Sequence, residues 1–196
     1  MLAQQCDFAL AANLVSVAVA SVLNTEAKNA IVGRDNPWPG WEMLDNNNRT
    51  KQIVVDGDNL YQIHNNGNIY QFTGTPMTGW RQLDNNPYSD RLVAANGDLY
   101  QLHSTNAIWK YTGTPFTGWE LIGNQKLPAT KLVATRGIVA KSDGSQRVKQ
   151  YTGVPLAEWP EIFYDDYGTY AICAADGELY TNTRGAVWKY TGTPGK

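Results

Sequence analysis

Four tryptophans recur at nearly constant spacing and divide most of the chain into repeats. Trp41, Trp80, Trp119 and Trp159 are 39, 39 and 40 residues apart. The segments that they open share a YTG or FTG triplet and a proline, which falls at Pro76, Pro115, Pro155 and Pro194. Structural repeats of this length bury their apolar faces by stacking on one another. The chain is therefore predicted to be a repeat architecture, with the four tryptophans packed between units.

Within one repeat, short runs of β-branched and aromatic residues alternate with Asn, Asp, Gly and Pro. The second repeat has four such runs, predicted as strands: Trp80–Leu83, Arg91–Ala95, Leu99–His103 and Ala107–Thr112. The separators "DNNP", "NGD" and "STN" have the composition of tight turns. Four antiparallel strands in about 40 residues make one blade of a β-propeller. We expect an all-β chain, a small β-propeller of about four four-stranded blades.

The repeats account for residues 37–196 and leave an N-terminal head at residues 1–36. The four units run over residues 41–79, 80–118, 119–158 and 159–196. The head is rich in Ala, Val and Leu and is predicted to be an apolar α-helix. Three roles remain open for it: a helix docked on the propeller, an oligomerisation helix, or a segment that contacts a membrane.

The phase of the repeat predicts how the ring closes. The last repeat stops before a further Trp strand, while "PWPGW" at residues 37–41 matches the junctions "PMTGW" and "PFTGW". If each Trp strand is the outer strand of the preceding blade, residues 41–44 are expected to complete the blade formed by residues 170–192.

The repeat resembles that of the tachylectin-2 and tectonin type of β-propeller lectin. The likeness rests on "LYQLHSTNAIWKYTGTPFTGW" at residues 99–119 and on "LDNN" at residues 83–86, and it extends over residues 37–196. Membership would imply shallow sugar sites between adjacent blades and no catalytic chemistry. Several weak sites on one molecule would bind together with avidity.

Polar loops follow two of the Trp strands and are candidates for hydrogen bonds to sugar hydroxyls. The candidate residues are Asp45, Asn46 and Asn47 in the first repeat and Asp84, Asn85 and Asn86 in the second. The alternative is that these side chains only close turns by bonding to the backbone. The third repeat has Gly123 and Asn124 in their place, so we expect no site there.

Histidines and aromatic residues supply the other candidates. His64 and His103 occupy one repeat position, at which the third and fourth repeats are aligned with Ser142 and Thr183. A turn role competes with ligand contact for both. At another position Tyr70, Trp109 and Trp188 alternate with Lys149, which suggests partial exposure and a surface for stacking on a sugar ring.

Charge and composition narrow the function classes. The net charge is −2 and there is no block of Lys or Arg, so a nucleic-acid partner is not expected. A duplicated histidine without a positioned partner argues against an enzyme, and nothing indicates a cofactor or a metal. Cys6 and Cys173 fit buried thiols, a staple between the two parts of the chain or an intermolecular link.

The sequence thus predicts a lectin that recognises surface glycans through several sites between blades. The alternatives are a non-enzymatic interaction or oligomerisation scaffold, and a lectin-like toxin whose N-terminal helix enters a membrane. An extracellular or cell-surface location would suit such a lectin, and a homo-oligomer is a further expectation.

Overall fold

The strands form twisted antiparallel sheets, one for each blade, in which strands that follow one another in the chain are neighbours. The computed structural model describes residues 38–123, 129–143, 147–166 and 171–192. Blade 1 has strand order β1-β2-β3-β4. Its strands are β1 (Thr50–Asp56), β2 (Asn59–His64), β3 (Ile69–Phe72) and β4 (Trp80–Asp84). Blade 2 is formed by β5 (Ser89–Ala95), β6 (Asp98–His103), β7 (Ile108–Tyr111) and β8 (Trp119–Gly123).

The other two sheets repeat this plan, except that the last is one strand shorter. Blade 3 comprises β9 (Ala129–Thr135), β10 (Ile138–Asp143), β11 (Arg147–Gln150) and β12 (Glu161–Tyr164). Within the described residues, blade 4 has β13 (Ala171–Ala175), β14 (Glu178–Thr183) and β15 (Ala186–Lys189), with β15 at the edge. The prediction of an all-β fold with four blades is confirmed. The predicted N-terminal helix and Cys6 lie outside the described residues.

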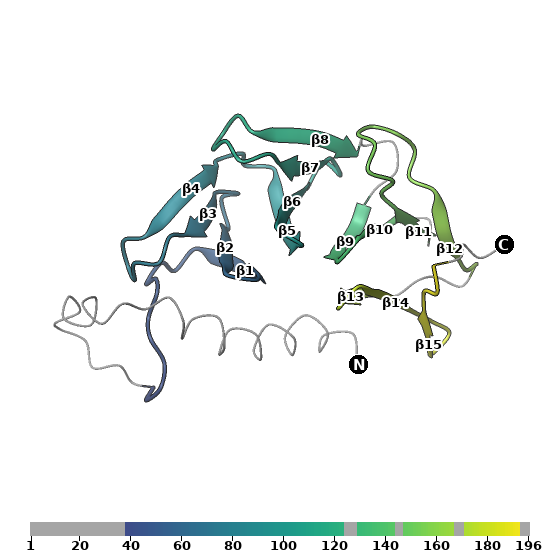
Figure 1. Cartoon of the computed structure of the whole chain (residues 1–196), viewed down its shortest axis with the longest axis horizontal. Helices are drawn as coiled ribbons and strands as arrows, with labels where there is room; N and C mark the ends of the chain where they lie inside the picture. The colour runs from purple at the N-terminus through teal and green to yellow at the C-terminus, as the bar shows by residue number, and fades with distance from the viewer. Residues whose placement is uncertain (1–37, 124–128, 144–146, 167–170, 193–196) are drawn as a thin grey trace.

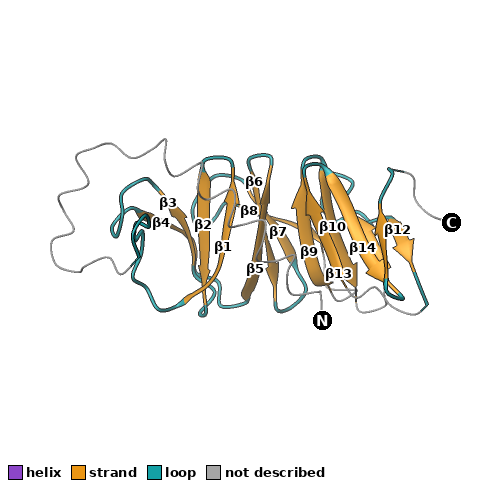
Figure 2. Ribbon diagram, turned by 90° about the horizontal axis from the view of Figure 1, so that it is seen from below, coloured by secondary structure: helices purple, strands orange, loops and turns teal. Residues whose placement is uncertain are grey.

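The blades follow one another along an open arc, with β1, β5, β9 and β13 as inner strands (Figure 1). Viewed from below, the sheets stand side by side (Figure 2). Local sequence explains the hairpins within each sheet. Asn96 and Gly97 both have positive φ, 58° and 84°, which is the type I′ turn that matches the twist of β5 and β6.

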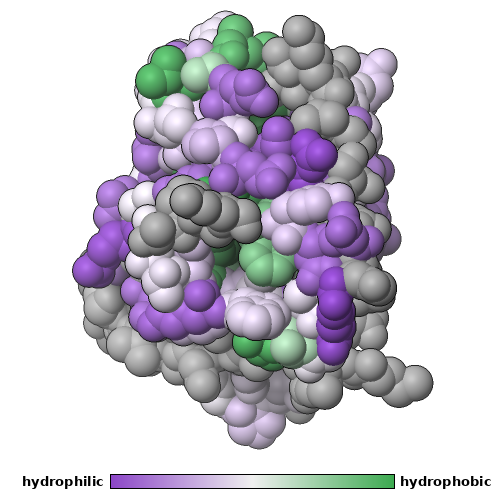
Figure 3. All heavy atoms as spheres, turned by 90° about the vertical axis from the view of Figure 1, so that its right-hand side faces the viewer, coloured by the Kyte–Doolittle hydropathy of each residue, from purple (hydrophilic) through white to green (hydrophobic). Residues whose placement is uncertain are grey.

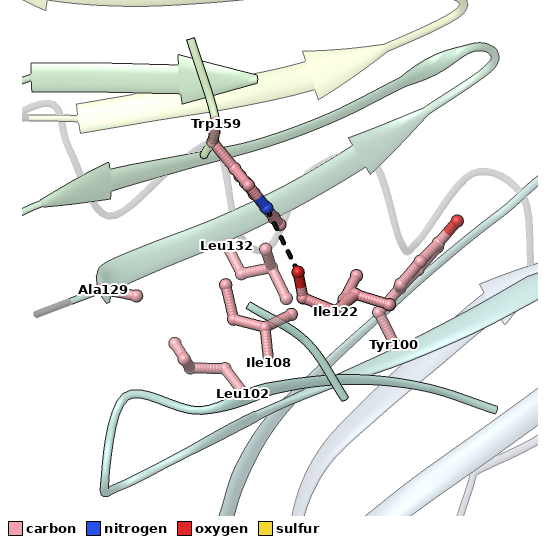
Figure 4. Close-up of a cluster of buried hydrophobic side chains, with 7 residues drawn as sticks. All are labelled: Tyr100, Leu102, Ile108, Ile122, Ala129, Leu132 and Trp159. Carbon is pink, nitrogen blue, oxygen red and sulfur yellow. Dashed lines mark hydrogen bonds between the residues drawn. The ribbon is translucent and has the colours of Figure 1, made fainter. Parts of the chain in front are cut away.

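The hydrophobic core is divided into three clusters, and each cluster lies between two adjacent blades. Between blades 2 and 3 it contains Ile108 and Ile122 from one side and Leu132 and Trp159 from the other (Figure 4). Equivalent clusters join blade 1 to blade 2 and blade 3 to blade 4. The blades are therefore stabilised by their neighbours, as expected when each sheet buries both faces.

A repeated hydrogen-bond pattern, here called the junction latch, links each of Trp80, Trp119 and Trp159 to the segment that holds the equivalent position one repeat earlier. The indole Nε1 donates to a carbonyl 36 or 37 residues earlier, and the backbone N–H three residues before the Trp donates to the same carbonyl. The Leu44 carbonyl accepts from Trp80 and Met77 (3.0 and 2.8 Å). The Leu83 carbonyl accepts from Trp119 and Phe116 (3.4 and 2.7 Å), and the Ile122 carbonyl accepts from Trp159 and Leu156 (3.3 and 3.2 Å). Met77, Phe116 and Leu156 all have positive φ.

Strand pairing shows that the strand after each of these tryptophans is the outer strand of the blade formed by the repeat before it, since β4 pairs with β3, β8 with β7 and β12 with β11. The packing role predicted for Trp80, Trp119 and Trp159 is confirmed, since each lies within or against a core cluster or a neighbouring ring. Trp41 differs because it is mostly exposed. The predicted closure is absent from the described residues: residues 41–44 form no strand with β15, and the two lie at opposite ends of the arc (Figure 1).

Two further observations concern the described ranges only. No helix in them is long and apolar enough to cross a membrane. No group of three or more His, Cys, Asp or Glu side chains in them is arranged to hold a metal ion. Cys173 lies half-buried on β13.

Candidate functional site

A polar network recurs at the start of blades 1 and 2, part-buried in blade 1 and buried in blade 2. In blade 2 the Ser89 hydroxyl donates to Gln101 Oε1 (2.5 Å), and Gln101 Nε2 donates to Asp84 Oδ2 (3.0 Å). Asp84 ends the outer strand of blade 1, so this network joins two blades. In blade 1 the matching bonds run from Thr50 to Gln62 (2.6 Å) and from Gln62 to Asp45 (2.7 Å).

A histidine and an aromatic ring adjoin each network. His64 is paired across the strands with Thr50, and His103 with Ser89. The His103 ring lies 5.7 Å from the Trp109 ring, centroid to centroid. In blade 1 the rings of His64 and Tyr70 are 4.6 Å apart. Each set of Asp, Gln, hydroxyl, His and aromatic residue is called here a junction site.

Both histidines are buried and carry hydrogen-bonding capacity that the described residues leave unused. His64 Nε2, His103 Nε2 and Trp109 Nε1 have no hydrogen-bond partner in the described part of the chain. Burial lowers the pKa of His103, and the nearby Asp84 carboxylate opposes that effect. Burial likewise lowers the pKa of His64, against the opposing effect of Asp45. The neutral imidazole is thus the favoured form in both junction sites.

The neutral histidines make stability dependent on pH. Below about pH 6.5, the ordinary pKa of histidine, the unfolded chain binds protons that the folded chain does not. Stability is therefore complete above that value and falls as the pH drops through it. We expect the melting temperature to fall by several degrees between about pH 7.5 and pH 5.5, as measured by circular dichroism. The His64→Gln, His103→Gln double variant should lose most of this fall; an unchanged profile would contradict the assignment.

The loop residues predicted as ligand contacts mainly close turns in this structure. Asp45 Oδ1 accepts the Asn47 N–H (3.0 Å), and Asn47 Oδ1 accepts the Arg49 N–H (2.8 Å). In blade 2, Asp84 Oδ1 accepts the Asn85 N–H (2.8 Å) and Asn86 Oδ1 accepts the Tyr88 N–H (3.0 Å). Asn46 and Asn85 are exposed at the same positions. The turn role weighed from sequence is thus present, together with the buried bonds of Asp45 and Asp84.

The third blade replaces the junction site with other side chains. Strand register places Lys141, Asp143 and Lys149 where blade 2 has Gln101, His103 and Trp109. The alignment of Ser142 with the histidines is therefore wrong by one residue, because the extra residue of this repeat precedes β10. Lys149 is buried, and Lys141 stacks 5.4 Å from the centre of the Trp159 ring.

The fourth blade retains only parts of a junction site. Thr181 and Thr183 occupy the Gln and His positions, and Trp188 lies opposite Thr181 as Trp109 lies opposite Gln101. Trp188 is exposed, unlike Tyr70 and Trp109, which are half-buried. The structure thus groups Asp45, His64 and Tyr70 in one place and Asp84, His103 and Trp109 in another, and it leaves Trp188 apart from both.

Sequence reasoning did not single out Gln62, Gln101, Thr50 or Ser89. The signal was available, because the two glutamines share one repeat position and change to Lys141 in the third blade. Such a polar residue on a strand between apolar neighbours indicates a buried hydrogen-bond partner.

Comparisons with known proteins show the fold. No protein-family profile matches the sequence, and no curated protein matches it. Among solved structures, yeast RCC1 (Prp20) bound to Kap60 is similar with a TM-score of 0.58 and 8% identity, over 76% of this chain and 46% of that chain. BamB from Moraxella catarrhalis is similar with a TM-score of 0.52 and 14% identity, over 74% of this chain and 45% of that chain. The fold is that of a β-propeller.

The extent of these matches differs from one structure to another. The chain spans about half the length of the RCC1 and BamB chains, 46% and 45%. The computationally designed Ika4 protein is matched over 94% of its own length and 76% of this chain, with 11% identity and a TM-score of 0.54. At these identities the likeness concerns architecture, so function has to be argued from the junction sites.

Proposed function

We propose that the protein is a non-enzymatic carbohydrate-binding propeller whose sugar sites are the junction sites of blades 1 and 2. One observation carries this proposal: blade 3 folds with the same apolar core positions but without the junction site. Ile69 and Ile108 have their counterpart in the buried Val148, whereas Gln101, His103 and Trp109 are replaced by charged residues. Since the fold does not require the set, its retention in two blades fits a binding role.

The chemistry of the junction site suits a sugar. A pyranose ring packs its C–H face on an aromatic ring, for which Tyr70 and Trp109 are half-exposed. Carboxylate, amide and imidazole groups accept and donate hydrogen bonds to hydroxyls. The unused Nε2 atoms of His64 and His103 add capacity that a ligand hydroxyl or a water can satisfy. The resemblance of the repeat to tachylectin-2 and tectonin lectins points the same way, as does the possibility of avidity from two sites.

A glycan array with the intact protein tests this proposal, followed by titration calorimetry with the strongest binder. Trp109→Ala should weaken binding at least about tenfold, because the stacking surface is lost and the adjoining His103 imidazole loses the ring that it lies against. Tyr164→Ala, which removes an exposed aromatic side chain of blade 3, is the matched control and should bind as the native protein does. No signal on the array at high loading, or equal loss in the control, would contradict the proposal.

A second candidate is a protein-interaction scaffold, favoured by apolar side chains on the outer rim. Phe116, Val154 and Leu156 are exposed on the junction loops of blades 2 and 3. Solved structures of yeast Prp20 concern its complex with Kap60 and its binding to Gsp1p and histones, which shows that such a fold serves protein binding in that case. Phe116→Ser should abolish capture of a protein partner and leave sugar binding unchanged.

A further inference from the structure

The last blade exposes a position that is buried in every other blade. Val187 lies opposite Asn182 on β14, just as Ile108 lies opposite Leu102 and Val148 lies opposite Ser142. Ile69, Ile108 and Val148 are all fully buried, whereas Val187 is 76% exposed. The difference arises because no blade follows β15 in the described chain. In Figure 3, which views this end of the arc, apolar groups lie at the surface among hydrophilic ones.

The first blade exposes the complementary position. Ile53 lies opposite Gln62, as Leu92 lies opposite Gln101 and Leu132 lies opposite Lys141. Leu92 and Leu132 are buried in the clusters between blades, but Ile53 is 49% exposed. The two ends of the arc thus present the two halves of one further core cluster.

The outer-strand positions at the two ends of the arc are complementary in the same way. Blade 4 lacks an outer strand, so β15 has an unpaired edge within the described residues, and such an edge is a template for another strand. Residues 41–45 repeat the sequence position of β4 and β8, but among the described residues they belong to no sheet. Leu44 already accepts a junction latch from Met77 and Trp80, as Leu83 does from Phe116 and Trp119. The described residues therefore include a blade without an outer strand and a segment, residues 41–45, that has the repeat position of an outer strand but belongs to no blade.

We propose that a second copy of this chain closes the ring, with residues 41–45 of each copy pairing with β15 of the other. Within one chain these segments lie at opposite ends of an open arc (Figure 1), so they do not meet there. Two copies related by a two-fold axis make this contact twice, which leaves no open end. Two arcs of four blades give eight, within the usual range for propellers.

The repeat register assigns the contacts of the new junction. The Ile162 carbonyl takes the place of Leu83 and Ile122, and Trp41 of the second copy takes the repeat position of Trp119 and Trp159. Val187 then packs with Ile53 and Leu44 of that copy. Asp45 comes to lie at the end of a paired outer strand, as Asp84 does at the end of β4, so the blade 1 junction site is completed by the same contact.

Light scattering on size-exclusion chromatography of the full chain tests the proposal. The native protein should have twice the chain mass of 21.7 kDa. Val187→Lys and Ile53→Lys should each yield the single-chain mass, because a buried, unpaired ammonium disfavours the junction. Val154→Lys is the matched control, since Val154 is 57% exposed on the rim away from the junction, and this variant should keep the doubled mass.

Circular dichroism establishes that the lysine variants are folded, which their surface positions in the single chain predict. A native protein of single-chain mass overturns the proposal, and so does a doubled mass that persists in either Val187→Lys or Ile53→Lys. Loss of the doubled mass in Val154→Lys overturns it as well, because the effect would then not belong to this junction. Sugar binding is not needed for any of these outcomes.

Discussion

Replacing Trp159 by alanine is expected to lower the free energy of unfolding by about 3–5 kcal/mol. The side chain is 4% exposed and lies in the cluster between blades 2 and 3 with Ile108, Ile122 and Leu132 (Figure 4). The substitution leaves a cavity there, removes the Nε1 bond to the Ile122 carbonyl, and deprives the buried Lys141 ammonium of the ring that it faces. Because whole domains are stable by only about 5–15 kcal/mol, this loss is a large share.

The change in the free energy of unfolding is measured by urea denaturation at a fixed protein concentration. The unfolding is followed by far-ultraviolet circular dichroism, because the substitution itself alters tryptophan fluorescence. Tyr88→Ala is the control, because Tyr88 is 55% exposed and its backbone carbonyl, which accepts from Ser104, is retained. Its effect should stay within about 0.5 kcal/mol. A Trp159→Ala protein as stable as the control would mean that the cluster between blades 2 and 3 does not hold them together.

Replacing Gly67 by alanine is expected to destabilise the first junction by about 2–5 kcal/mol. Gly67 has φ of 85°, and a Cβ there would lie 2.2 Å from the Asn86 carbonyl oxygen and 2.9 Å from Pro87 Cα. Both neighbours are backbone atoms, so relief requires the loop between β4 and β5 to move away. That loop carries Asp84, whose bond to Gln101 should weaken as a result.

Gly97 is a matched control for this substitution. Its φ is 84°, nearly the same, but a Cβ there would meet nothing within 4 Å. Gly97→Ala therefore reports only the cost of a left-handed alanine, about 1–2 kcal/mol. The difference between the two variants in denaturant midpoint isolates the steric contact. Equal midpoints would show that the 86–87 loop yields freely and that the junction site tolerates its displacement.

Much of the fold was predictable, because the same local sequence pattern recurs in every repeat. The spacing of Trp80, Trp119 and Trp159 and the alternation of apolar runs with turn residues predict the strands within one to two residues, and Asn96 with Gly97 predicts a hairpin. The phase of the Trp strand follows from the same pattern. These features depend on short stretches of backbone, for which sequence spacing is sufficient.

The junction sites were predicted only in part because their geometry depends on contacts between repeats. His64, His103, Tyr70 and Trp109 were named from sequence as separate candidates, and only the structure places each histidine beside its aromatic ring. The bond from Gln101 back to Asp84 joins different blades and is not indicated by the spacing. A one-residue insertion before β10 moved the aligned position from Ser142 to Asp143. The prediction that the ring closes within one chain was wrong. The repeat pattern indicates which segments are complementary, but the curvature of the arc determines whether they meet within one chain.

Each blade contains strands from two sequence repeats, and this also determines the order in which the blades can unfold. Every blade before the last obtains its outer strand, and the indole donor of the latch on that strand, from the repeat that follows. A cut between repeats at Trp119 would therefore take β8 from blade 2, although the β5, β6 and β7 strands would remain with their own repeat. No single blade can therefore unfold without removing contacts from its neighbour. In the separated single chain, such as the Val187→Lys variant, opening should instead spread from the three-stranded end toward blade 1, with amide exchange fastest in β15 and slowest in the middle sheets.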